Sequence, residues 1–263
     1  MNLAGDAARD ARADGRSPSA RLYLTEPARG LARLAVLPLA APWLAAAPRG
    51  DGHGVLVLPG LLASDLSTAL LRRFLRRLGY DVHGWELGRN VGPTDAVLDG
   101  LPLALAALAA RTGSPVSVVG WSLGGIYARE LAREHPGQVR GVITLGSPFA
   151  LTDPRQSRAD SVYRRRSYLH AGPGRVPTRD QVAQPIGVPS TAVYSRRDGI
   201  VTWQACVEPE TAVHENVEVR CGHLGFGADP ATLWLIADRL AVPVGQWRRF
   251  RPPAPLRPLY PAG

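Results

Sequence analysis

Hydrophobic and polar positions follow two rhythms along this chain. Short, mostly apolar runs, such as Val55–Leu58 and Val139–Leu145, predict strands; the four consecutive apolar residues of the first predict a strand that is buried on both faces. Between such runs, apolar residues recur at helical spacing; from Leu66 to Leu78 they fill one face while arginines fill the other. Strands that alternate with helices predict an α/β class, and 263 residues fit one domain with an insertion.

The same pattern places the individual elements. We expect strands at residues 55–58, 80–84, 116–120, 139–145, 190–195 and 216–219. Helices are expected at residues 65–78, 94–111, 123–135 and 230–240. Pro102 predicts a kink in the second of these helices, and Asp229 followed by Pro230 predicts the start of the fourth.

Three segments depart from this alternation. Residues 1–50 form an N-terminal extension whose start is poor in large apolar residues and is expected to be mobile. The main domain covers residues 51–245 and contains an arginine-, glycine- and proline-rich insertion at residues 150–189. Residues 246–263 form a proline-rich tail that is expected to extend over the surface.

The extension contains one short apolar segment, Leu34–Ala47. A membrane-spanning helix needs ~20 apolar residues, and Pro38 and Pro42 interrupt this shorter segment. A signal peptide does not fit, because the preceding segment is long and carries several acidic residues. We expect a broken helix packed on the domain or near the mouth of a site, with peripheral membrane contact through residues 31–47 as an open alternative.

Composition narrows the choice of partner. The formal net charge is +9, and all 31 basic residues are arginine. These arginines are scattered and form no basic stripe with interleaved aromatic residues, so no nucleic-acid partner is predicted. No Cys-x-x-Cys or His-x-x-x-His spacing occurs, so no metal site is predicted either. A cytoplasmic location is expected, with membrane association as the variant.

One pentapeptide carries specific chemistry. Residues 120–124, Gly-Trp-Ser-Leu-Gly, match G-x-S-x-G at a point where a strand passes into a helix. Side chains two residues before or after a serine in so tight a turn would collide, and Gly120 and Gly124 remove them. The turn lifts the Ser122 hydroxyl above the sheet at a helix N-terminus, where free N–H groups favour negative charge.

With this motif and its downstream partners, the chain resembles the α/β-hydrolase superfamily, in particular small lipases and esterases. The resemblance implies an α/β-hydrolase fold: a mostly parallel sheet of about six strands, helices on both faces, and a small cap formed by residues 150–189. A long surface loop fits residues 150–189 equally well. It also implies an oxyanion hole made by the backbone N–H groups of Leu61 and Leu123. Many relatives have His-Gly where this chain has Pro59–Gly60, which affects the shape expected of that loop.

The resemblance assigns two further residues. Asp198 follows the strand at 190–195, at the place of the family's acid, and His223 lies in a glycine-flanked loop after the last strand. Ser122, Asp198 and His223 then occur in the chain order of this superfamily. His214 is a rival base, but it precedes the last strand and should lie at the opposite end of the sheet. The remaining histidines lack a glycine-loop context and are expected to have no catalytic role: His53, His83, His135 and His170.

Some residues near these positions are open to two interpretations. Trp85 and Leu87 fit an acyl pocket and plain packing equally well, and Phe149 faces the cleft if its turn matches that of lipases. Cys206 and Cys221 lie near the predicted acid and base, so they form either a disulfide that ties the two loops or two free thiols in a reducing compartment.

The predicted activity is hydrolysis of carboxylic esters with an apolar acyl group, as in an esterase or lipase, through an acyl-serine. The partner is then a small-molecule ester or lipid, and no cofactor is needed. Two alternatives stay open. One is an acyltransferase on the same fold, in which an alcohol outcompetes water; the other is a non-catalytic, hydrolase-like binding protein.

Overall fold

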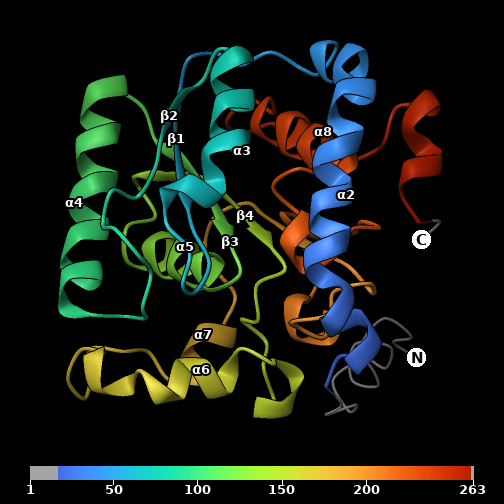
Figure 1. Ribbon diagram of the computed structural model, residues 1–263. Helices are drawn as coiled ribbons and strands as arrows, with labels where there is room; N and C mark the ends of the chain where they lie inside the picture. Colours follow the sequence, from blue (N-terminus) through green and yellow to red (C-terminus); the bar gives the residue numbers. More distant parts are fainter. Residues whose placement is uncertain (1–16, 262–263) are drawn as a thin grey trace, which may run out of the picture.

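A computed structural model describes residues 17–261, and within this range six strands form one parallel sheet (Figure 1). The strands stand in the order β2-β1-β3-β4-β5-β6, and each pairs with its neighbour in parallel. This confirms the predicted fold class and number of strands. The bounds are β1 Gly54–Leu58, β2 Asp81–His83, β3 Val116–Trp121, β4 Val139–Leu145, β5 Ser190–Tyr194 and β6 His214–Glu218.

The strand order reverses at β1. From β1 the chain moves outward to β2, then returns past β1 to β3 and continues in one direction to β6. In open parallel sheets, such a reversal leaves a crevice outside the carboxyl ends of the strands. The loops that follow β1 and β3 meet there, which brings Leu61 and Ser122 to one end of the sheet.

Helices cover both faces of the sheet, as predicted. Side chains of one strand point alternately to opposite faces, so Leu56 and Leu58 join one apolar cluster and Val55 and Val57 the other. The first cluster is covered by α4 Asp95–Thr112 and α5 Leu123–Glu134; the second is covered by α2 Ala20–Ala45, α3 Asp65–Arg77 and α8 Pro230–Leu240.

The local signals that predicted two of these helices are visible as hydrogen bonds. The Thr94 hydroxyl accepts from the Val97 N–H at 3.3 Å, and the Asp229 carboxylate accepts from the Thr232 N–H at 3.0 Å. Each bond satisfies a donor that the first turn of a helix leaves free. Pro102 lies inside α4, which continues through it.

The broken helix expected in the N-terminal extension is not found: Ala20–Ala45 form one continuous helix, α2. It lies beside α8 and η4 His223–Gly225 (Figure 1). Its three prolines are exposed, whereas its buried residues lie on the opposite face. Packing of that face holds the helix together although each proline removes a backbone hydrogen bond. Residues 1–16, where mobility was expected, lie outside the described residues. The buried residues of α2 are Glu26, Gly30, Ala40 and Leu44.

The outward face of α2 carries large apolar side chains. Leu31, Leu39 and Trp43 are 66%, 79% and 50% exposed. No helix within residues 17–261 combines the length and the hydropathy needed to cross a membrane. The peripheral membrane contact through residues 31–47 stays a prediction, and these three side chains are available for it.

The tail does not extend over the surface as expected. Its helical turn, η5 Ala254–Leu259, folds back, and Leu256 and Tyr260 are buried in the apolar cluster that includes α8. The Tyr260 hydroxyl donates a 2.7 Å hydrogen bond to the Ala231 carbonyl oxygen. Burial of these two side chains stabilises the packing of the tail on the domain, which the proline content of the tail did not predict.

Candidate active site

Ser122 stands between β3 and α5 in a strained turn. Its backbone has φ +53° and ψ −120°, a combination that residues with a side chain rarely adopt. A Cβ atom on Gly120 would overlap the Gly124 carbonyl oxygen, and one on Gly124 would overlap the Leu58 carbonyl oxygen. The collisions expected from the sequence are therefore real, and the turn depends on both glycines.

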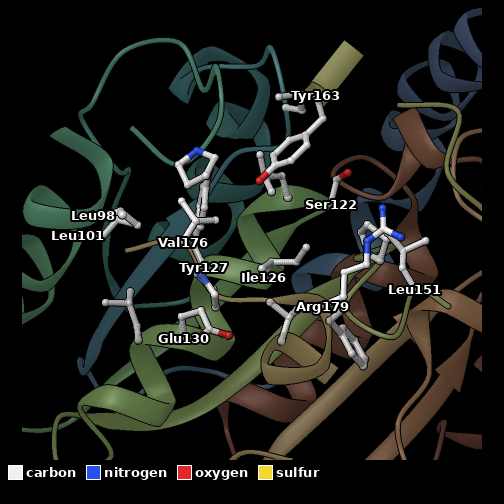
Figure 2. A pocket seen from close by; sticks show the side chains of 18 of the residues that line it. Leu98, Leu101, Ser122, Ile126, Tyr127, Glu130, Leu151, Tyr163, Val176 and Arg179 are labelled. Atoms are coloured by element: carbon white, nitrogen blue, oxygen red, sulfur yellow. The ribbon is translucent and has the colours of Figure 1, made fainter. Parts of the chain in front are cut away.

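The Ser122 side chain lines a cavity of about 350 Å³ (Figure 2). This volume is within the range of small-molecule sites. Among residues 17–261 no group hydrogen-bonds to the Ser122 hydroxyl, which leaves it free to meet a ligand. Figure 2 shows Ser122 on one side of the cavity and α4 residues on the other; the apolar lining includes Leu98, Leu101, Ile126, Leu151, Tyr163 and Val176.

The two predicted oxyanion-hole residues lie beside the serine. Leu61 and Leu123 line the same cavity as Ser122. A Cβ atom on Gly60 would lie 3.2 Å from Cβ of Ser122, so the loop after β1 passes directly over the turn. Within the described part of the chain, neither the Leu61 nor the Leu123 N–H donates to a protein acceptor. Both donors are therefore open to an oxygen bound in the cavity.

A buried asparagine holds the loop that carries Leu61. Nδ2 of the Asn90 side chain donates to the Pro59 carbonyl oxygen at 2.9 Å. The backbone carbonyl oxygen of Asn90 accepts from the Leu62 N–H at 2.7 Å. Leu62 has a φ of +63°, so the bend needs such support. Sequence analysis missed Asn90, for which the only signal was its place in the glycine-rich loop after β2.

Asp198 and His223 form a buried pair. Nδ1 of His223 lies 2.6 Å from Oδ2 of Asp198, and the other Asp198 oxygen accepts from the N–H groups of Ile200 at 2.7 Å and Val201 at 2.8 Å. Burial alone would lower the pKa of His223. The charge of Asp198 and its hydrogen bond, together with the charge of Glu26, outweigh burial and raise that pKa above its usual value.

Two features place this pair against the ends of β3 and β4. Gly146, at the end of β4, has a φ of +55°, and a Cβ atom there would lie 3.1 Å from both Oδ2 of Asp198 and Nδ1 of His223. The indole N–H of Trp121 donates to the His223 carbonyl oxygen at 3.1 Å. The loop of His223 is thereby attached to the residue that precedes Ser122. Ser122, Asp198 and His223, which are far apart in the sequence, therefore lie at one end of the sheet.

Solved structures share this architecture. The structure reported with the metagenome-derived lipolytic enzymes LipS and LipT has a TM-score of 0.54 at 15% identity, over 73% of this chain and 93% of that chain. Lipase B of Aspergillus fumigatus has a TM-score of 0.51 at 17% identity, over 74% of this chain and 54% of the lipase. The protein has the α/β-hydrolase fold.

Two curated relatives match part of this chain. The pimeloyl-(acyl-carrier protein) methyl ester esterase of Aromatoleum aromaticum is 32% identical over 105 residues, 31% of this chain and 42% of that enzyme. The enzyme of the same name from Neisseria meningitidis is 33% identical over 96 residues, 28% of this chain and 31% of that enzyme. The matched part thus spans less than half the length of either relative. No protein-family model matches the chain.

The insertion at residues 150–189 contributes to the wall of the cavity. It supplies Tyr163, Val176 and Arg179 to the lining (Figure 2). Phe149, at the start of the insertion, also lines the cavity, in agreement with the prediction that it faces the cleft. The short helices of this segment are η1 Pro154–Gln156, α6 Asp160–Arg165, η2 Ser167–Leu169 and α7 Arg179–Ala183.

Of the two interpretations of Trp85 and Leu87, the structure supports packing rather than an acyl pocket. Trp85 is buried in the cluster of α4 and α5, where its indole N–H donates to the Gly88 carbonyl oxygen at 2.9 Å, and Leu87 packs against the same cluster. Neither residue lines the cavity of Ser122. Cys206 and Cys221 are free and buried, which excludes the disulfide, and burial raises the pKa of both thiols.

His214 lies where it was expected. It opens β6, which runs parallel to β5, so it sits at the amino end of the sheet, and its Nε2 lies 3.3 Å from the Val188 carbonyl oxygen. His53, a predicted bystander, is also buried away from the cavity and bonds Ser117 at 2.8 Å. Both imidazoles lie at the amino ends of strands, His53 just before β1 and His214 at the start of β6, opposite the end of the sheet that carries Ser122.

Proposed function

We propose that this α/β-hydrolase is an esterase that hydrolyses carboxylic esters with an apolar acyl group through an acyl-serine on Ser122. The observation that carries the proposal is the placement of one strained serine hydroxyl, unpaired among residues 17–261, at the wall of a largely apolar cavity and at the same end of the sheet as a buried carboxylate–imidazole pair. Both curated relatives are named as esterases, which supports the same class of reaction.

In the proposed mechanism, the Ser122 oxygen attacks the ester carbonyl while Nε2 of His223 takes its proton. Asp198 holds the imidazole through Nδ1 and stabilises its cationic form. The N–H groups of Leu61 and Leu123 hold the oxyanion, and each such donor contributes about 3 kcal/mol to transition-state stabilisation. His223 then gives its proton to the departing alkoxide, which leaves as the alcohol.

Deacylation repeats these steps with water. His223 takes a proton from water, the hydroxide attacks the acyl carbon, and the same two N–H groups hold the second oxyanion. When the intermediate collapses, the carboxylic acid leaves and Ser122 recovers its proton from His223. The proposed chemistry uses side chains and backbone of the chain alone.

The cavity supports an apolar acyl group as the recognised half of the substrate. Its lining on the side of α4 and α5 is mostly leucine and isoleucine, with Tyr127 and Pro102 beside them and the carboxylates of Glu130 and Glu134 as the charged groups of these two helices. Each CH₂ group that leaves water for such a surface gains about 0.8 kcal/mol. We therefore expect the specificity constant to rise with acyl length until the cavity is full and then to fall.

Hydrolysis of p-nitrophenyl esters, from acetate to laurate, tests the proposal. Ser122→Ala is compared with Ser64→Ala, a control at a serine whose side chain makes no capping hydrogen bond. We expect wild type and Ser64→Ala to turn over the esters and Ser122→Ala to lose about 10⁴-fold or more in kcat. Wild-type turnover in Ser122→Ala would overturn the assignment.

Product analysis in the presence of added alcohols separates the alternatives. Free acid as the main product agrees with an esterase. A new ester as the main product would assign an acyltransferase to the same site. A folded wild-type protein that turns over no ester would favour the binding-protein alternative.

A further inference from the structure

A buried carboxylate from the N-terminal extension reaches the loops of Asp198 and His223. Glu26, on α2, is only 1% exposed. Its Oε1 accepts from the Gly199 N–H at 2.6 Å and from the His223 N–H at 3.0 Å, and its Oε2 accepts from the Leu224 N–H at 3.1 Å. Gly199 lies 173 residues further along the chain and His223 lies 197 residues further. One side chain thus joins three segments of the molecule.

The position of the donors Gly199 and His223 matters for the proposed chemistry. Gly199 directly follows the candidate acid, and His223 is the candidate base. One carboxylate therefore sets the distance between the backbone of the acid loop and the backbone of the base loop. A second link between the two loops is the Ser195 hydroxyl, which donates to the Cys221 carbonyl oxygen at 2.6 Å.

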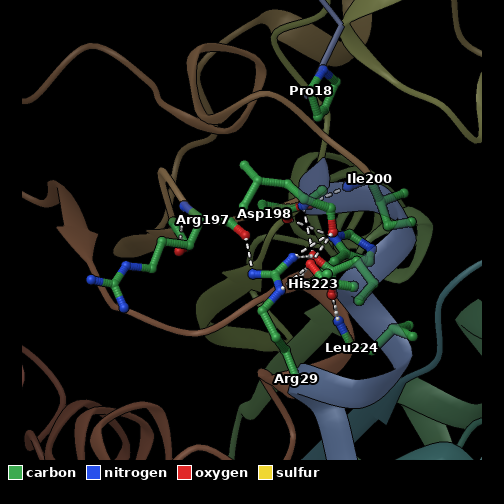
Figure 3. Close-up of polar contacts among 12 residues, drawn as sticks. Pro18, Arg29, Arg197, Asp198, Ile200, His223 and Leu224 are labelled. Atoms are coloured by element: carbon green, nitrogen blue, oxygen red, sulfur yellow. Dashed lines mark hydrogen bonds and ion pairs between the residues drawn. The ribbon is translucent and has the colours of Figure 1, made fainter. Parts of the chain in front are cut away.

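Arg29, one turn further along α2, completes the contact. Its Nη2 donates to Oε1 of Glu26 at 2.7 Å, and its Nη1 donates to the Arg197 carbonyl oxygen at 2.6 Å (Figure 3). Arg197 and Gly199 flank Asp198, so α2 bonds to the chain on both sides of the candidate acid. The guanidinium also balances the charge of Glu26, which burial would otherwise make costly.

Close approach of the helix depends on residues without side chains. A Cβ atom on Gly199 would lie 2.5 Å from the Leu22 carbonyl carbon, and one on Gly222 would lie 2.6 Å from Oε2 of Glu26. On the helix, a Cβ atom on Gly30 would lie 3.2 Å from Cβ of Leu224. Glycines on both partners therefore let α2 sit directly against the two loops.

We infer that Glu26, supported by Arg29, is a positioning residue of this enzyme, through which α2 holds Asp198 and His223 in catalytic register. The inference rests on the proposed function for its catalytic meaning. It gives the N-terminal extension, which lies outside the α/β core, a part in building the site. It also gives a role to the packing on η4 of α2, a helix that contains three prolines.

The charges around His223 determine how its pKa responds to a substitution of Glu26. Asp198 and Glu26 face it as anions; on the α2 side, Arg29 is bonded to Glu26, and Arg33 lies 3.3 Å from the Asp229 carboxylate. Glu26 contributes to the raised pKa of His223. Glu26→Gln keeps the shape but removes one negative charge and one acceptor, so the imidazolium loses stabilisation and the pKa falls.

The test compares Glu26→Gln with a matched control, Glu215→Gln. Glu215 is also buried, and it accepts three hydrogen bonds where Glu26 accepts four: from Thr191 at 2.9 Å, Arg239 at 3.1 Å and the Phe250 N–H at 2.7 Å; it lies near the amino end of β6. We expect Glu26→Gln to lose about 10- to 100-fold in kcat with KM within about two-fold of wild type. The control should keep kcat within about two-fold.

An NMR titration of the His223 ring supplies a readout that needs no turnover. We expect the His223 pKa to fall by about one pH unit in Glu26→Gln and to stay unchanged in Glu215→Gln. If wild type hydrolyses no ester, the proposed function fails while this titration still tests the placement. Wild-type kcat, or an unmoved His223 pKa, in Glu26→Gln overturns the inference.

Arg29→Lys decides the matter if Glu26→Gln does not fold. Lysine keeps the charge but cannot donate to both the Arg197 carbonyl and the Glu26 carboxylate in the fork geometry of a guanidinium. We expect a loss of about three- to ten-fold in kcat, since one of the two bonds survives. Wild-type kcat in a folded Arg29→Lys protein overturns the inference.

Discussion

The indole of Trp121 and the backbone of His223 are joined by a hydrogen bond, from Nε1 to the carbonyl oxygen, of 3.1 Å. Trp121 is the last residue of β3, and His223 begins η4, 102 residues later. A Cβ atom on Gly227 would lie 2.9 Å from a ring carbon of Trp121, so the indole also packs closely against Gly227. The residue next to the candidate nucleophile therefore supports the loop of the candidate base.

Trp121→Phe tests this support. Phenylalanine keeps most of the ring packing but leaves the His223 carbonyl oxygen without its donor. We expect the free energy of unfolding to fall by about 1 kcal/mol and kcat to fall several-fold, because the imidazole loses one restraint on its placement. Thermal unfolding and ester turnover measure the two effects. A variant with lowered stability and wild-type kcat would show that this bond supports the fold alone.

The pH dependence of activity follows from the charges around His223. The imidazole must be neutral to accept the Ser122 proton, so kcat/KM should rise with pH through the pKa of His223 and then level off. Burial lowers that pKa, but Asp198 and Glu26 raise it by more, so the midpoint should lie above 6.5. A pH profile of kcat/KM on one ester measures it, and a midpoint below 6.5 would contradict the electrostatic account.

The acyl end of the cavity can be shortened by one substitution. Ile126 lies on α5 and lines the cavity, so Ile126→Phe adds bulk where the acyl chain is expected. We predict that the preferred ester becomes shorter and that kcat/KM for the longest good substrate falls about 10-fold or more. Leu103→Phe, on the exposed face of α4, is the control and should leave the chain-length profile as in wild type. An unchanged profile in Ile126→Phe would place the acyl group elsewhere.

The membrane contact proposed for residues 31–47 has a direct assay. The exposed Leu31, Leu39 and Trp43 supply an apolar face, and a net charge of +9 favours anionic lipid. Wild type should sediment with phosphatidylglycerol-containing vesicles, and replacement of all three residues by serine should abolish this. Leu66→Ser, at an exposed leucine on α3, should sediment as wild type does. Equal sedimentation of the triple variant would exclude this face as the contact.

Strong local signals account for what the sequence predicted. The glycines around Ser122 report a steric need within five residues, and Asp229 and Thr94 report helix starts within one turn. The buried strand at residues 55–58 was visible as an unbroken apolar run. Such signals involve neighbours in the chain, so they are legible without a structure. They sufficed to place the predicted strands and helices to within a few residues.

Long-range packing accounts for what the sequence did not predict. Pro38 and Pro42 suggested a break in α2, but they face outward and the inner face holds the helix. The partners of Glu26 are backbone N–H groups, which any residue carries, so no side-chain pattern announces them. Asn90 was hidden for the same reason, because its acceptor is a backbone carbonyl.

The central claim is that Ser122 is the nucleophile. Reaction of the folded protein with a fluorophosphonate, followed by tandem mass spectrometry of the digest, tests it most directly. We predict one modification, on the peptide that contains Ser122, with labelling lost in Ser122→Ala and slowed in Asp198→Asn. Equal labelling of wild type and Ser122→Ala, or a label on another residue in wild type, would contradict the account.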